Sequence, residues 1–292
     1  MSKKIAVVSL GCDKNRVDTE KMLWYLSDGD YVVVADYAEA DVIIVNTCAF
    51  IESARKEAIE TILEMSRYKT VGRCKKLIAT GCLVEKYREE LEKEMPEVDA
   101  FLGIGEYEKI RACIGEDVPA AIPADDRILT TPPHYAYMRI ADGCDNFCTF
   151  CTIPSIRGKY RSRTLESLDS EAKKLSDAGV KELILVAQDV TSYGKDLYGN
   201  PSLLSLLKVI SKYDFKWIRL MYCYPELVTD ELIDEIAHNT KIAKYIDIPM
   251  QHVSDTVLKR MNRRSNYAEL CSLCDKLKAK GIALRTTFMV GF

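Results

Sequence analysis

Residues 135–151 read YAYMRIADGCDNFCTFC, an apolar strand followed by a loop with three cysteines. Cys144, Cys148 and Cys151 have the spacing C-x3-C-x2-C. With 11 cysteines in 292 residues, a random chain would contain this triple roughly 0.015 times. The loop is therefore a candidate site, and the strand before it begins a candidate domain.

From residue 135 onward, strand-like and helix-like segments alternate. The predicted strands are 135–141, 182–188, 217–222, 245–250 and 283–290, and the predicted helices are 165–178, 203–212, 229–238 and 267–280. Five strands connected in this way predict an α/β fold with a partial (βα) barrel. The chain stops soon after the last strand without a covering helix, so we expect a truncated sequence.

The first third of the chain shows the same alternation. Its predicted strands are 5–10, 31–35, 41–46, 76–80 and 98–104, and its predicted helices are 15–27, 52–68, 84–95 and 106–113. Residues 41–46 (DVIIVN) are almost continuously apolar, as in a parallel sheet covered on both faces. We expect an open parallel α/β domain over 1–118, a proline-rich linker over 119–133, and the barrel domain over 134–292.

Composition narrows the class of protein. Hydrophobic residues make up 48% and charged residues 29%, and the formal net charge is −3. These values indicate a folded protein and argue against a globally basic nucleic-acid binder, while a local basic patch stays possible. Without a secretory signal or an apolar run of about 18 residues, we expect a cytoplasmic protein that does not enter a membrane. In that reducing compartment, clustered cysteines indicate metal or redox chemistry.

The cysteine loop can hold a metal group in two ways. Three thiolates can bind three irons of a [4Fe-4S] cluster and leave the fourth iron open to another ligand. A structural zinc site needs a fourth Cys or His nearby, and His134 lies ten residues before Cys144, across the predicted strand. The pattern therefore favours an iron-sulfur cluster over zinc.

A second set of cysteines is dispersed along the first domain. Cys12, Cys48 and Cys82 each follow a predicted strand by one to three residues. All three are expected at the carboxyl edge of the sheet, where ligands gather in open α/β folds. Position alone leaves two readings open, a shared metal site or small residues that fit tight turns. The remaining five cysteines are predicted to be structural: Cys74, Cys113, Cys223, Cys271 and Cys274.

Other polar and aromatic groups lie near the cysteine loop. Four cations in seven residues follow it and could meet a carboxylate, an acidic loop or RNA, or form a solvated loop: Arg157, Lys159, Arg161 and Arg163. Gln188 and Asp189 lie at the end of the second strand of the predicted barrel. They could bind a ligand there or form an ordinary turn after the strand. Tyr222 and Tyr224 are predicted to pack at the barrel mouth.

The loop resembles that of radical S-adenosylmethionine (SAM) enzymes, because its cysteine spacing is accompanied by Phe150 just before the third cysteine. The resemblance implies a [4Fe-4S] cluster on Cys144, Cys148 and Cys151 whose open iron binds SAM. It also implies that reduction cleaves SAM to a 5′-deoxyadenosyl radical. Phe150, Gln188 and Asp189 are then the candidate cofactor-binding residues.

Longer stretches resemble the methylthiotransferases within that superfamily. They are SLGCDKNRVDTE, NTCAFIESARKEAIE, ATGCL and RGKYRSR. The resemblance implies a second [4Fe-4S] cluster on Cys12, Cys48 and Cys82. Asp13 and Arg16 depart from the family pattern without removing a ligand. Relatives continue into a further barrel strand and a small TRAM domain, both of which we expect to be missing from this sequence.

The family has two well-known branches. The RimO branch modifies an aspartate of small-subunit ribosomal protein S-twelve, and the MiaB branch modifies an isopentenylated adenosine of tRNA. IPSIRGKYRSR, VAQDVTSYG and YIDIPMQHVSDTVLKRMNRR resemble the RimO branch. The expected activity is transfer of a methylthio group to the aspartate β-carbon. The resemblance also implies a reductant such as flavodoxin or ferredoxin, a sulfur donor, and a possible RNA or ribosome contact. The alternatives are a MiaB-like tRNA enzyme and a non-catalytic iron-sulfur electron carrier.

Overall fold

The computed structural model describes residues 2–27, 29, 31–115 and 126–292, and the chain divides into two compact units, Met1–Thr130 and Thr131–Phe292. Residues 119–125 of the predicted linker lie outside the described part. Farther along that segment, the backbone N–H of Ile128 donates to the Glu20 carbonyl oxygen at 3.1 Å, and Arg127 pairs with the buried Glu20 carboxylate. Residues 127–130 therefore pack on the first unit.

The first unit is a parallel sheet with the strand order β2-β1-β3-β4-β5. Its strands are β1 (Lys3–Ser9), β2 (Tyr31–Val33), β3 (Val42–Thr47), β4 (Lys76–Gly81) and β5 (Ala100–Leu102). Its helices are α1 (Asp13–Ser27), α2 (Glu52–Ser66), α3 (Tyr68–Val71), α4 (Cys82–Glu94) and α5 (Ile110–Cys113), with 3-10 turns η1 (Tyr37–Glu39) and η2 (Tyr107–Lys109). The predicted open α/β sheet is confirmed.

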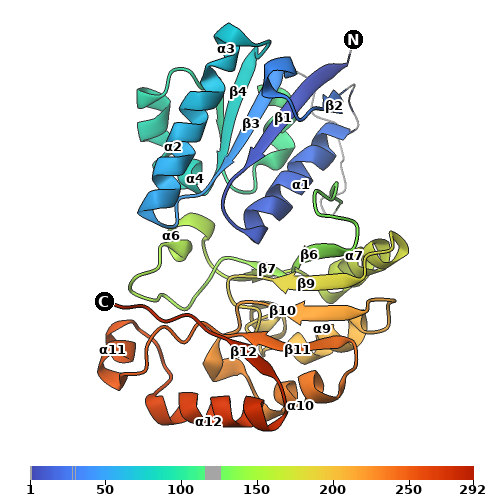
Figure 1. The fold of residues 1–292 in the computed structure, drawn as a ribbon, viewed down its shortest axis with the longest axis vertical. Helices are drawn as coiled ribbons and strands as arrows, with labels where there is room; N and C mark the ends of the chain where they lie inside the picture. The colour runs from blue at the N-terminus through green and yellow to red at the C-terminus, as the bar shows by residue number, and fades with distance from the viewer. Residues whose placement is uncertain (1, 28, 30, 116–125) are drawn as a thin grey trace. The chain divides into compact units, whose positions relative to one another are not determined.

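Helices cover this sheet on both faces (Figure 1), with α1 on one side and α2 and α4 on the other. All six residues of β3 are buried, as expected for a central strand of a covered parallel sheet. Side chains two apart in β3, such as Val42 and Ile44, share one core with Met22 of α1 and Ile110 of α5. This core fixes the carboxyl ends of the central strands in space.

The second unit has a parallel sheet whose strands follow chain order, β6-β9-β10-β11-β12. These strands are β6 (Tyr135–Arg139), β9 (Glu182–Val186), β10 (Trp217–Leu220), β11 (Ile242–Asp247) and β12 (Ala283–Arg285). The connecting helices are α7 (Leu165–Asp177), α8 (Lys195–Tyr198), α9 (Leu203–Ile210), α10 (Asp230–His238), α11 (Asp255–Arg260) and α12 (Tyr267–Ala279), with the 3-10 turn η3 (Pro225–Leu227). Sequential parallel strands joined by helices form the predicted partial barrel.

Side-chain caps start several of these helices. The Thr164 hydroxyl accepts from the Ser167 N–H at the start of α7, and Asn266 and Glu269 form a capping box at α12. None of the helices in the part of the chain that the structure describes is both long and apolar enough to cross a bilayer.

A short antiparallel pair, β7 (Ala141–Asp142) and β8 (Arg161–Ser162), interrupts the barrel pattern. The connection between these two strands carries the cysteine loop and the short helix α6 (Ile153–Arg157). The strand predicted over 135–141 is thus divided into β6 and β7. The sequence does not reveal this division, because β7 and β8 are too short to show a hydrophobic period. The β7–β8 pair closes the base of the loop.

Candidate functional site

The three dispersed cysteines of the first unit follow three neighbouring strands. Cys12 comes after β1, Cys48 directly follows β3, and Cys82 directly follows β4. Thr47 pairs with Gly81 across the ladder, so the next residues of the two strands, Cys48 and Cys82, are neighbours. The three cysteines therefore lie at the carboxyl edge of one sheet, as predicted.

Two glycines allow the backbone to close around these thiols. Gly11 has φ +87°, and a Cβ there would lie 2.7 Å from Cys48 Cβ and 3.1 Å from Cys48 Sγ. Gly81 has φ +93°, and its added Cβ would lie 2.5 Å from the Thr47 carbonyl oxygen. Only glycine fits both the backbone conformation and the space, which explains why Cys12 and Cys82 each follow a glycine.

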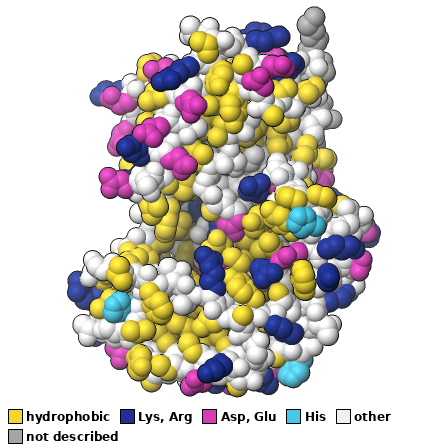
Figure 2. Space-filling view, in the orientation of Figure 1, with side chains coloured by type: hydrophobic (Ala, Val, Ile, Leu, Met, Phe, Trp, Pro, Cys, Tyr) yellow, Lys and Arg dark blue, Asp and Glu magenta, His cyan; other side chains and the backbone are white. Residues whose placement is uncertain are grey.

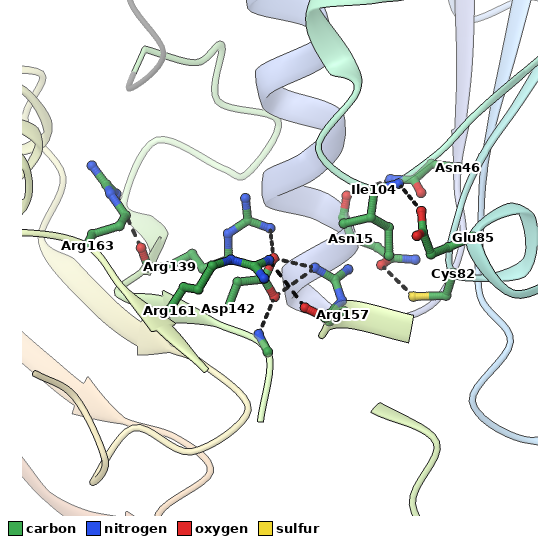
Figure 3. A network of polar contacts seen from close by, with 11 residues as sticks. Asn15, Asn46, Cys82, Glu85, Ile104, Arg139, Asp142, Arg157, Arg161 and Arg163 are labelled. Atoms are coloured by element: carbon green, nitrogen blue, oxygen red, sulfur yellow. Dashed lines mark hydrogen bonds and ion pairs between the residues drawn. The ribbon is translucent and has the colours of Figure 1, made fainter. Parts of the chain in front are cut away.

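The buried amide of Asn15 links the strand ends to Cys82 (Figure 3). Its Nδ2 donates to the Leu10 carbonyl oxygen at 3.1 Å and to the Thr47 carbonyl oxygen at 2.9 Å. Its Oδ1 accepts from the Cys82 thiol at 3.6 Å. Asn15 was not singled out from the sequence, although it lies one helical turn after Cys12 and could have been found by that spacing.

The cysteine loop of the second unit is closed at its base by backbone contacts. The Cys144 N–H donates to the Gly158 carbonyl oxygen at 3.1 Å. Gly143 has φ +76°, and a Cβ there would lie 2.1 Å from the Lys159 carbonyl oxygen. The Cys151 N–H donates to the Cys148 carbonyl oxygen at 2.9 Å, which folds the second half of the loop into a turn.

The loop thiols influence one another electrostatically. Burial raises the pKa of the Cys144 thiol to about 11, and the nearby Cys148 and Cys151 add to the rise. Burial also raises the pKa of Cys151, again with a contribution from Cys148. Burial and the neighbouring thiols thus disfavour ionisation of Cys144 and Cys151, and a cationic metal group would offset this effect.

The donor set decides which metal group fits. Thiolate sulfur suits zinc and iron-sulfur clusters. Among the described residues, no three Cys, His, Asp or Glu side chains are grouped so that they could hold a metal ion. In a [4Fe-4S] cluster each thiolate binds a different iron, so its ligands stand farther apart than the ligands of one zinc ion. By donor chemistry, each set of three thiols can serve as ligands of an iron-sulfur cluster.

The predicted cofactor residues lie around the same loop. Phe150 is half-buried and meets Phe292 edge to face, with ring centroids 6.4 Å apart. Gln188 is half-buried just after β9. The Asp189 carboxylate is buried and already accepts hydrogen bonds from its own turn, from Thr191 Oγ1 at 2.5 Å and Ser192 Oγ at 2.7 Å. As candidate cofactor ligands, these three residues stay predictions.

A cavity of about 220 Å³ opens beside the loop. It is lined by Asp145, Asn146, Tyr160, Asp189, Ser192, Lys195, Asp196 and Arg264. The Asn146 amide donates to the Asp189 carboxylate at 3.0 Å, so one wall joins the cysteine loop to the end of β9. Charged groups of both signs line the cavity, as a zwitterionic ligand requires.

The four predicted cations divide into two groups. Arg157 is buried and donates to the Asp142 carboxylate at 3.2 Å. Arg163 pairs with Glu171. Lys159 and Arg161 are exposed. On the face drawn in Figure 2, basic side chains are interspersed with acidic and apolar ones. The sequence run therefore supplies two structural arginines and two exposed cations.

Arg139 and Arg157 both act on Asp142 (Figure 3). The Arg139 guanidinium lies 3.7 Å from the Asp142 carboxylate. Burial opposes ionisation of this carboxyl group, but the charges of Arg139 and Arg157 hold its pKa below the ordinary value. The ion pairs fix β7 and α6, which carry the two ends of the cysteine loop.

Residues 4–103 match the family described as "Uncharacterized protein family UPF0004", and residues 138–292 match the radical SAM superfamily. "Ribosomal protein uS12 methylthiotransferase RimO" of Clostridium botulinum (strain Eklund 17B / Type B) is 52% identical over 305 residues, which cover 99% of this chain and 68% of that protein. The protein of the same name from Clostridium tetani (strain Massachusetts / E88) is 51% identical, with the same coverage.

Solved structures share the fold at low sequence identity. The radical SAM methyltransferase TsrM from Kitasatospora setae, with cobalamin and a [4Fe-4S] cluster bound, has a TM-score of 0.68 and 14% identity, covering 99% of this chain and 69% of that one. The cobalamin-dependent SAM radical enzyme OxsB has a TM-score of 0.69 and 14% identity, covering 99% and 49%.

The sequence resemblance that rested on the two cysteine sets is confirmed by the relatives of about 50% identity. The chain belongs to the RimO methylthiotransferase family of the radical SAM superfamily.

Proposed function

We propose that this chain transfers a methylthio group to the β-carbon of an aspartate of ribosomal protein uS12. The observation that carries the proposal is 52% identity to a RimO protein across 99% of the chain. The relatives' name supplies the ribosomal protein, and the aspartate β-carbon is the position implied by the sequence resemblance. We propose a cytoplasmic location for this activity, because ribosomal proteins are made in the cytoplasm.

Two sets of cysteines are proposed as cluster ligands. Cys144, Cys148 and Cys151 would bind the [4Fe-4S] cluster to which SAM attaches, with Phe150, Gln188 and Asp189 beside the cofactor. Cys12, Cys48 and Cys82 would bind the second cluster. Neighbouring strand ends support the second set, and the closed loop with mutually interacting thiols supports the first set.

When bound, the cluster and SAM supply radical chemistry, which suits a carbon–hydrogen bond that is too weakly acidic for a side-chain base. The protein's own groups hold the site. Gly143 lets the chain turn into the loop, and the Asp142–Arg157 ion pair fixes both ends of the loop. The mixed charges around the 220 Å³ cavity suit the amino and carboxylate groups of SAM.

The proposed activity requires two partners besides the substrate. A one-electron reductant such as flavodoxin or ferredoxin would serve the cluster, and a sulfur donor would supply the transferred sulfur. The exposed Lys159 and Arg161 are available for an acidic or RNA surface of the ribosome.

Anaerobic reconstitution with iron and sulfide, followed by iron counting, tests the ligand sets. The wild-type chain should bind about eight irons, and Cys148→Ala and Cys48→Ala should each bind about four. Cys271→Ala, in α12, is the matched control and should keep about eight. Zinc in place of iron, or equal iron content in all four proteins, would reject the two-cluster proposal.

Mass spectrometry of ribosomal protein uS12 and of bulk tRNA, from cells with and without the gene, tests the substrate. The methylthio mass should disappear from the ribosomal protein alone. Its loss from tRNA alone would favour the MiaB-like alternative. Release of 5′-deoxyadenosine from SAM by the reduced protein separates an enzyme from an electron carrier.

A further inference from the structure

Two side chains far away in the sequence converge on the middle cysteine of the loop. The Tyr224 hydroxyl oxygen lies 2.9 Å from Cys148 Sγ, and Arg263 Nη1 lies 3.9 Å from the same sulfur. Both side chains are largely buried, at 9% and 6% exposure. They approach Cys148 across separations of 76 and 115 residues, so the contact is a product of the fold.

The two side chains also hold each other. The Arg263 guanidinium carbon lies 3.8 Å from the centroid of the Tyr224 ring, which is the geometry of a cation–π stack. Arg263 Nη2 donates to the Pro249 carbonyl oxygen at 2.8 Å, and the Tyr224 N–H donates to Thr191 Oγ1 at 3.0 Å. The positions of the hydroxyl and guanidinium groups are therefore fixed before any ligand binds.

The direction of the Tyr224–Cys148 hydrogen bond follows from chemistry. A tyrosine phenol has an ordinary pKa of about 10, so it keeps its proton at neutral pH. A thiolate has no proton to give. Once Cys148 is a metal ligand, the phenol must be the donor and the sulfur the acceptor.

Hydrogen bonds to a cluster sulfur have a defined electronic effect. Donors and nearby positive charge stabilise the reduced, more negative form of the cluster, so they raise its reduction potential. Tyr224 supplies a neutral donor, and Arg263 supplies both a donor and a charge.

We infer that Tyr224 and Arg263 are positioning residues for Cys148, and that they raise the reduction potential of the cluster this cysteine binds. The inference rests on the proposed function, because it takes Cys148 as an iron ligand. It adds a role to the predicted packing of Tyr224 at the barrel mouth, since the Tyr224 hydroxyl also reaches the loop sulfur.

The test isolates one cluster in the whole chain. In a parent carrying Cys12→Ala, Cys48→Ala and Cys82→Ala, only the loop set stays, and about four irons should bind. Titration with dithionite, followed by electron paramagnetic resonance, gives the midpoint potential for uptake of one electron. This readout does not depend on turnover.

Tyr224→Phe removes the hydroxyl and keeps the ring. In the parent background, its midpoint potential should become more negative by the equivalent of about a tenfold change in equilibrium constant, about 59 mV for one electron. Tyr213→Phe is the matched control, because the Tyr213 hydroxyl donates to Asp169 of α7 at 2.6 Å and not to a loop cysteine. The control should keep the parent potential.

Arg263→Gln gives a second, independent variant if Tyr224→Phe loses iron. Its potential should shift in the same direction, and the double variant should shift by less than the sum, because the two groups act through one contact. An unchanged or more positive potential in either variant, with about four irons bound, would overturn the inference alone. A parent that binds no iron would overturn the proposed ligand set and the inference with it.

Discussion

The side-chain amide of Asn262 donates a hydrogen bond to the Phe147 carbonyl oxygen at 3.0 Å, across 115 residues of sequence. The same amide donates to the Asn146 carbonyl oxygen at 3.2 Å. Next to it, the Thr149 N–H donates to the Met261 carbonyl oxygen at 3.2 Å. The turn after α11 therefore holds the backbone of the cysteine loop.

Replacement of Asn262 should loosen this attachment. Asn262 has φ 59°, which glycine adopts freely and alanine does not. Asn262→Ala should therefore lower the free energy of unfolding by about 1 kcal/mol more than Asn262→Gly, while both lose the two amide hydrogen bonds. Urea unfolding of the metal-free proteins gives the comparison. Equal stability of the two variants would show that the left-handed turn carries no strain.

Gly11→Ala should disturb the strand-end set of Cys12, Cys48 and Cys82. The new Cβ would collide with Cys48, whereas Gly105, with φ +86°, has open space around an added Cβ. At both positions alanine would be strained by the positive φ to a similar degree, so Gly105→Ala is the matched control. After reconstitution, Gly11→Ala should bind about four irons and Gly105→Ala about eight. Full iron content in Gly11→Ala would mean that Cys48 can move without losing its role.

Asp142→Asn should destabilise the second unit, because it removes a carboxylate from two buried guanidinium groups. We expect the free energy of unfolding to fall by about 3 kcal/mol at pH 7. Asp177→Asn, in an exposed pair with Lys173, should change it by less than about 1 kcal/mol. Because the folded pKa of Asp142 is lowered, its contribution is present above its unfolded pKa of about 3.9 and is lost as the pH falls below it.

Glu106 makes the stability of the first unit depend on pH. Hydrogen bonds from Lys109, Arg88 and the Gly103 N–H lower its pKa from 4.5 to about 2. A lowered carboxyl pKa stabilises the fold above pH 4.5, and this stabilisation is lost as the pH falls through 4.5 toward 2.

Glu106→Gln should therefore cost about 1 kcal/mol at pH 7, after allowance for the exposed partners, and progressively less in acid. Urea unfolding of both proteins at pH 7, 5 and 3 measures the difference. A difference that stays constant across this range would contradict the assignment.

Local sequence predicts the fold because the strands carry their own pattern. The apolar run at 41–46 becomes β3, buried along its whole length. Strand β11 begins at Ile242, three residues before the predicted start at residue 245. The prediction starts too late because the charged Lys244 interrupts the apolar pattern. The Lys244 ammonium instead donates to the Asn239 carbonyl oxygen at 2.7 Å. Pattern alone cannot foresee such a contact.

The sequence predicts where the candidate ligands lie in the fold, but it does not predict which groups surround them. Strand ends identified Cys12, Cys48 and Cys82, because parallel strands end at one edge. The groups around the thiols come from distant turns, as Asn262 and Arg263 do, and no local spacing indicates them. Charge runs also mislead, since Arg157 belongs to a buried ion pair and not to an exposed patch.

The register between β3 and β4 has a consequence for the order of assembly. Cys12, Cys48 and Cys82 become neighbours only when β1, β3 and β4 have paired, whereas Cys144 and Cys151 are close along any chain. Bringing distant thiols together in an unfolded chain has an entropic cost of loop closure. In the folded sheet this cost has already been offset by strand pairing, so metal binding does not bear it. If these cysteines are the cluster ligands that we propose, metal loading at the strand ends would follow formation of the sheet, while the loop could capture iron during folding.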